Sequence, residues 1–228
     1  MIGLGRRAVY FLIAAGTLAA PGVLATAPDP ADHSMRKFLS QEDVLHPYRA
    51  TRRLEAENGD RKGWLEVTTE YSRLGGFRYE TIAEGGSGYI RNKILRAVLE
   101  GERDAVTQGD AAKSALVPTN YQFEPHGIDA EGLANILVSP RRKDSTLVAG
   151  TLFLQPTGGD LVRLEGRLAK SPSFWVKNVD ITRSYASIDG TTMPVVLHSN
   201  AEIRLLGAAT FHMTYVYSEV DGRPVATR

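Results

Sequence analysis

Apolar and polar residues alternate along residues 160–218, and this pattern predicts four consecutive strands joined by tight turns. The third of these strands places the following side chains on one face: Val195, Leu197, Ala201, Ile203 and Leu205. The fourth does the same with Ala209, Phe211, Met213, Tyr215 and Tyr217. A period of two over this length buries one side of each strand. The pattern therefore indicates an antiparallel sheet with one polar and one apolar face.

The same alternation predicts more strands earlier in the chain. Residues 49–57 and 64–72 flank a turn rich in Asn, Gly and Asp, and Gly75-Gly76 leads into a third strand at 77–82. Further strands are predicted at 120–124, 133–141 and 145–154. The total is about ten strands.

One amphipathic helix is predicted at 89–104, directly after the segment Gly85-Gly86-Ser87-Gly88. Ile90, Ile94 and Val98 form its apolar stripe, so this side is expected to lie on the sheet. A minor helix is predicted at 33–44 with Ser34 as its cap, after a disordered leader at 28–31. Residues 105–114 are expected to form a polar loop.

Together these elements predict a mainly β (α+β) fold. Its core is a single curved antiparallel sheet that forms an open half-barrel, covered by one main amphipathic helix. Neither a repeat nor a linker rich in Pro, Gly or Ser divides the chain, so residues 28–228 are expected to form one domain.

The N-terminus has the pattern of a secretory signal peptide. Arg6 and Arg7 precede an apolar run at 8–20, and Ala25-Thr26-Ala27 offers a cleavage site, so residues 1–27 are expected to be removed on export. The alternative is a membrane anchor, but the run is shorter than the roughly 20 residues that a spanning helix needs. The chain has no cysteine, so it holds no disulfide and no acylated N-terminal Cys. A periplasmic location is the expectation.

The overall charge and the histidines exclude several classes of function. A formal net charge of +1 argues against nucleic acid as a partner, since such proteins normally carry a basic excess. The five histidines do not have a metal-ligand spacing, so no metal and no cofactor is expected. His198 and His212 fall on polar faces of neighbouring strands and can meet across a hairpin.

No catalytic residue is expected, and the chain is predicted not to be an enzyme. Tyr89 replaces the last glycine of a G-x-S-x-G motif around Ser87, and no P-loop follows the glycines. The glycines before the helix are open to two interpretations: an anion site formed by free N–H groups, or a plain turn from strand to helix.

Aromatic residues are frequent on the predicted strands, and they also have two interpretations. They fill a core under the helix, or several of them line an apolar ligand cavity between sheet and helix. On the second interpretation the ligand-binding residues are Leu65, Val67, Tyr71, Phe77, Tyr79, Ile94, Val98, Phe211, Met213 and Tyr215.

The segment Leu74-Gly75-Gly76-Phe77-Arg78-Tyr79-Glu80, on the third strand of an exported chain, resembles the outer-membrane lipoprotein carrier family. The order of the later strands is similar to that family and to periplasmic lipoprotein-sorting and envelope-stress relatives. The resemblance implies an open, strongly curved barrel whose concave side holds acyl chains. It also implies that Phe77 and Tyr79 face inward, while Arg78 and Glu80 face outward.

The resulting functional hypothesis is a periplasmic, non-catalytic protein that shields a lipid acyl chain or a similar apolar ligand and takes part in lipoprotein sorting to the outer membrane. Its expected partners are lipid or lipoprotein acyl chains, with an envelope protein as a second candidate. The alternative is an envelope protein-interaction or stress-sensing module of the same fold, for which Phe174 and Trp175 form a sticky edge. A hydrolase with catalytic groups from distant segments is a third hypothesis.

Overall fold

The computed structural model describes residues 29–41, 45–174, 176–205 and 207–226. Within these residues one sheet of eleven strands dominates, in the order β3-β2-β1-β10-β9-β8-β7-β6-β5-β4, with the short β11 paired to β10. The strands are β1 (Tyr48–Asn58), β2 (Arg61–Ser72), β3 (Gly76–Gly86), β4 (Tyr121–Ile128), β5 (Ala134–Pro140), β6 (Val148–Leu154), β7 (Leu161–Leu168), β8 (Val176–Ile188), β9 (Thr191–Ile203), β10 (Gly207–Val220) and β11 (Arg223–Pro224).

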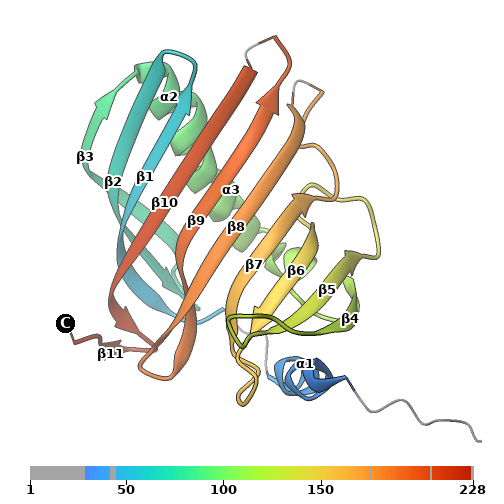
Figure 1. The fold of residues 1–228 in the computed structure, drawn as a ribbon. Helices are drawn as coiled ribbons and strands as arrows, with labels where there is room; N and C mark the ends of the chain where they lie inside the picture. Colours follow the sequence, from blue (N-terminus) through green and yellow to red (C-terminus); the bar gives the residue numbers. More distant parts are fainter. Residues whose placement is uncertain (1–28, 42–44, 175, 206, 227–228) are drawn as a thin grey trace, which may run out of the picture.

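The strand pairs are antiparallel, and the sheet ends at β3 on one side and β4 on the other without closing into a barrel. The first and last long strands are neighbours: β1 pairs along its length with β10, which lies beside it in Figure 1. The predicted fold class, a mainly β protein with one open antiparallel sheet and one main helix, is confirmed.

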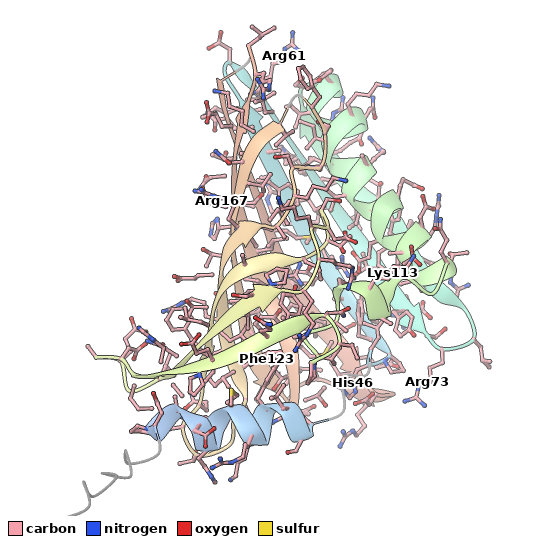
Figure 2. The ribbon with its side chains drawn as sticks, turned by 90° about the vertical axis from the view of Figure 1, so that its right-hand side faces the viewer. His46, Arg61, Arg73, Lys113, Phe123 and Arg167 are labelled. Atoms are coloured by element: carbon pink, nitrogen blue, oxygen red, sulfur yellow. The ribbon has the colours of Figure 1, made fainter. Side chains whose placement is uncertain are left out.

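The main helix follows β3 and runs through α2 (Gly88–Ile90), a π-helical segment η1 (Arg91–Leu95) and α3 (Arg96–Thr107). Its beginning packs against β1 and β2, and α3 packs against β3. Figure 2, which views the sheet from its side, shows this helix on one side of the sheet and Arg167 pointing away on the other. Ile90 of the predicted apolar stripe is completely buried, together with Leu95 and Leu99, which lie beside the stripe. Ile94 and Val98 are only half-buried.

A second helix covers the other half of the sheet. Helix α1 (Pro30–Ser40) packs against β4, β5 and β6, at the lower end of the view in Figure 1. The apolar core accordingly has two parts. One lies between the main helix and strands β1–β3, β9 and β10, and the other lies between α1 and strands β4–β7.

Several predicted boundaries were wrong. Helix α1 begins at Pro30, not 33, because Asp29 caps it by accepting a hydrogen bond from the backbone of Ala31 at 2.8 Å and proline suits the first turn. Ser34 is therefore not the cap but a buried residue, whose hydroxyl donates to the carbonyl of Pro156 at 2.9 Å. The leader predicted as disordered at 28–31 partly belongs to this helix.

The region predicted as a polar loop at 105–114 is largely helical. Helix α3 continues to Thr107, and α4 (Ala111–Ser114) follows a short turn. The polar residues there misled the interpretation, because an exposed helix end needs few apolar positions. The predicted signal peptide lies outside the described residues, and so do residues 42–44 of the predicted minor helix.

Glycines at one position of the sheet permit a close backbone approach. Gly150 of β6 lies directly opposite Gly166 of β7. A Cβ atom on Gly150 would stand 1.9 Å from the carbonyl oxygen of Glu165, and one on Gly166 would stand 2.3 Å from that of Ala149. A side chain at either position would force the backbones of these two paired strands apart.

Candidate functional site

The residues predicted to bind a ligand do come together on the inner face of the sheet, under the main helix. Four of them are buried in the core: Leu65, Val67, Phe77 and Met213. Five are half-buried and pack against that core: Tyr71, Tyr79, Ile94, Phe211 and Tyr215. Val98 of α3 is also half-buried. Phe77 and Tyr79 face inward while Arg78 and Glu80 are exposed, as the resemblance implied.

The inner face also holds an arginine that the sequence analysis did not identify. Arg52 lies on β1 between Val67 and Tyr215, its partners on the two neighbouring strands, and its side chain is 1% exposed. Both of its terminal nitrogens donate to the carboxylate of Glu102 on α3, at 2.6 and 3.0 Å. This bidentate pair ties the helix to the middle of the sheet.

Aromatic rings surround the Arg52 guanidinium. Its central carbon lies 4.5 Å from the ring centre of Tyr215, 5.2 Å from that of Phe77 and 5.5 Å from that of Tyr48. Arg52 also donates to the Tyr48 hydroxyl. The ring faces provide favourable electrostatic contacts that partly replace the water lost on burial.

Burial dominates the acid–base properties of these groups. It raises the pKa of the Tyr48, Tyr215 and Tyr217 phenols, so all three stay neutral. Burial alone would lower the pKa of Arg52, but the hydrogen bond and charge of Glu102 outweigh it and raise this pKa. Arg52 is therefore a permanent cation inside the fold.

A second arginine, Arg183 of β8, points to the same face. Its direct partners are Leu164 on β7, which is buried, and Leu197 on β9, which packs on the core under the main helix. Arg183 thus stands between the two parts of the core. Its Nε atom is shielded from solvent and has no hydrogen-bond partner among the described residues.

The phenol of Tyr185 has the largest effect on Arg183, and it raises the pKa of this guanidinium against the opposing effect of burial. Glu102 and Tyr215 also act on Arg183, but no carboxylate in the described part of the chain forms an ion pair with it. We name this group, which spans β1, β8, β10 and α3, the arginine–tyrosine cluster; it comprises Tyr48, Arg52, Glu102, Arg183, Tyr185, Tyr215 and Tyr217.

The sequence did contain a signal for both arginines. Arg52 lies in phase with Ala50 and Leu54, and Arg183 with Ile181 and Tyr185. An arginine at a position where the alternation demands an inward side chain indicates a buried charge. The burial of both arginines was nevertheless not predicted.

The other candidate features lie away from this cluster. His198 and His212 do meet across β9 and β10, with their Nδ1 atoms 3.1 Å apart. Among the described residues no group of three or more His, Asp or Glu side chains is arranged to hold a metal ion. At Gly86, which has φ +77°, a Cβ atom would stand 2.3 Å from the carbonyl oxygen of Lys62. This close packing accounts for a glycine in the turn before the main helix.

A hollow of about 520 Å³ lies at one end of the sheet, between the connection before β8 and the turn before β10. Phe174 and Leu205 contribute to its lining and are 74% and 93% exposed. The guanidinium of Arg204 lies 4.8 Å from the Phe174 ring centre. Trp175, the other residue of the predicted sticky edge, lies outside the described residues.

None of the helices in the described ranges combines the length and the apolar character that crossing a membrane would require. No family model matches the chain, and no curated protein matches it.

Solved structures to which it is similar include a LolA superfamily protein from Nitrosomonas europaea, at 10% identity, with 86% of this chain and 94% of that chain covered and a TM-score of 0.42. A DUF1329 family protein from Desulfovibrio piger matches at 8% identity, with coverage of 82% and 92% and a TM-score of 0.38. The MucA/MucB complex of Pseudomonas aeruginosa matches at 9% identity, with coverage of 86% and 99% and a TM-score of 0.21.

Proposed function

We propose that the chain is an exported, non-catalytic binding protein of the periplasm that shields an acyl chain or a similar apolar ligand on the concave face of its sheet. The supporting observation is the part of this face that lies between the two helix-covered regions. Apart from Arg183 and Ser199, the inward side chains there are apolar or aromatic, yet only half-buried; they include Ile181, Tyr185, Val195, Leu197, Phe211 and Tyr215.

The deeper residues of the predicted lining already contact one another. Leu65, Val67 and Met213 have almost no exposed surface beneath the main helix. A ligand therefore reaches the half-buried band first, and it reaches the deeper residues when the helix moves away. An acyl chain gains about 0.8 kcal/mol per buried methylene, so partial burial of a long chain suffices for binding.

Export supports the same proposal. The N-terminal pattern of a signal peptide would deliver the mature chain to a compartment where lipids must cross water between two membranes. In this setting a role in lipoprotein sorting to the outer membrane is the specific form of the proposal, with lipid or lipoprotein acyl chains as partners.

Two adjacent residues of β9 provide a sharp test. Leu197 faces the concave side, and Val196 faces the other side in the next position of the strand. Leu197→Trp is expected to fill the band and to weaken binding of the neutral fluorophore N-phenyl-1-naphthylamine, while Val196→Trp is expected to bind it like the wild type. Lipid extraction and mass spectrometry of protein purified from the periplasm should also yield a bound acyl lipid. Absence of both fluorophore binding and lipid would refute the proposal.

A second candidate function is an envelope protein-interaction module. The specific observation that favours it is the pair of exposed apolar residues, Phe174 and Leu205, which lie beside the same hollow. Replacing both by serine should abolish capture of one stoichiometric envelope protein and leave fluorophore binding unchanged. If capture survives in this variant, the candidate fails.

A further inference from the structure

The concave face contains more positive than negative charge. Arg52 and Arg183 both point inward, and Glu102 is the one carboxylate that acts on both. Glu102 uses its two oxygens for Arg52, at 2.6 and 3.0 Å. Arg183 is left with a phenol, Tyr185, and without an anion of its own among the described residues.

A desolvated cation without an anion is costly in a folded protein. Several other arginines on the strands pair with carboxylates, including exposed ones. Arg167 contacts Asp180 at 2.7 Å, and Arg163 contacts Glu165 at 2.7 Å. Arg183 lies half-buried on the inner face with a solvent-shielded Nε atom and is without such a pair among the described residues, which leaves it open to an anion from outside the chain.

The surroundings of Arg183 define what else that anion must carry. Leu164 and Leu197 lie directly beside it on the neighbouring strands, and Ile181 precedes it on the same face. One row further along, Ile181 and Phe211 both lie opposite Ser199 of β9. An anion bound at Arg183 therefore lies against apolar surface, which suits a molecule with a hydrocarbon tail.

We propose that Arg183, together with Tyr185, binds the anionic head of an amphiphile, a carboxylate or a phosphate, whose tail lies along the half-buried apolar band of the concave face. This assignment rests on the proposed function and specifies its ligand class. The planar guanidinium can give two parallel hydrogen bonds to either anion, and the Tyr185 hydroxyl can give a third. Arg52 already has a partner in Glu102 and keeps the helix in place beside the head group.

The test compares three amphiphiles with the same tail: dodecanoate, dodecyl phosphate and dodecanol. Each competes with N-phenyl-1-naphthylamine, which is neutral and reports on the apolar band. The wild type is expected to bind at least one of the two anions about tenfold more tightly than the alcohol, because its head gains charge-assisted hydrogen bonds. Preference for one anion over the other identifies the head group.

Arg183→Met is expected to bind all three amphiphiles with the affinity that the wild type shows for dodecanol. Arg167→Met is the matched control: it removes an exposed arginine from the other side of the sheet and should keep the wild-type preference. Arg183→Lys keeps the charge but loses the planar fork, so its preference is expected to be smaller than that of the wild type.

Two further measurements separate the outcomes. Arg183→Met should unfold in urea at a midpoint equal to or above that of the wild type, because it removes an unmatched charge; a large loss of stability would show a structural arginine and overturn the proposal.

Inorganic phosphate alone should not displace dodecyl phosphate, and displacement would overturn the requirement for a tail. Equal binding of all three amphiphiles by the wild type would refute the head-group site but not the proposed function. Failure of every probe to bind would refute the proposed function itself.

Discussion

The pair between Arg52 and Glu102 makes a quantitative prediction. Glu102→Gln keeps the shape of the side chain but removes the charge that compensates Arg52, which is 1% exposed. Breaking a buried ion pair by removing one partner costs about 3–5 kcal/mol. Glu102 itself is 35% exposed, so water replaces part of the interaction. We therefore expect the free energy of unfolding to fall by about 2–3 kcal/mol.

The assay is urea unfolding followed by circular dichroism and tryptophan fluorescence. With a slope of about 2 kcal/mol per molar urea, the midpoint should fall by roughly 1 M in the Glu102→Gln variant. Glu57→Gln is the control, because Glu57 pairs with Lys62 at the surface and its loss should leave the midpoint unchanged. The double variant Arg52→Met/Glu102→Gln should recover most of the loss, because no unpaired charge is left buried at position 52. A wild-type midpoint in Glu102→Gln would refute the compensation of Arg52 by Glu102, and so would a double variant that is less stable than the single one.

Three other changes test separate parts of the fold. Gly150→Ala should destabilise the protein by about 3 kcal/mol, since its Cβ would stand 1.9 Å from a backbone oxygen; a wild-type melting temperature would contradict the close strand crossing. Ser34→Ala should cost about 1 kcal/mol, because it leaves a backbone carbonyl without its hydrogen bond, and thermal unfolding measures this loss. Burial lowers the pKa of His212 in the folded state, and the charge of the neighbouring His198 lowers it further. The unfolded chain therefore takes up a proton that the folded chain resists, and stability should fall as the pH drops through about 6.5. His212→Gln should lose less stability than the wild type between pH 8 and pH 5.5, and equal losses would show that His212 contributes nothing.

The sequence predicted most of the architecture because the alternation along the strands is regular. The inward positions of β10 follow a period of two from Phe211 to Tyr217, and the stripe of the main helix follows a period near 3.6. The division of the apolar core between two helices was harder to predict from the sequence. The contacts of α1 with β4–β6 join residues far apart in the chain, and Ser34 donates to the carbonyl of Pro156, 122 positions away, so no local pattern encodes them.

The candidate site was predicted in part. The apolar residues around Phe77 and Met213 were found from their phase along the strands, but the arginine–tyrosine cluster was not. Arg52 and Arg183 occupy inward positions, and Arg52 is neutralised by Glu102, which lies on a helix about fifty positions further along the chain. Burial of a charge is a property of the assembled fold, so the sequence shows the position of each arginine but not the distance to its anion.

The pairing of β1 with β10 has a consequence for how the chain folds. A chain that emerges with its N-terminus first can form the hairpin of β1 and β2 early, since these strands are adjacent in sequence. The other edge of β1 stays open until residues 207–220 arrive, because β10 is its neighbour there. Contacts of such sequence separation slow folding, and the open edge can pair with other chains in the meantime. The nascent protein thus depends on rapid completion of its C-terminus, or on a chaperone that protects this edge until the last long strand is in place.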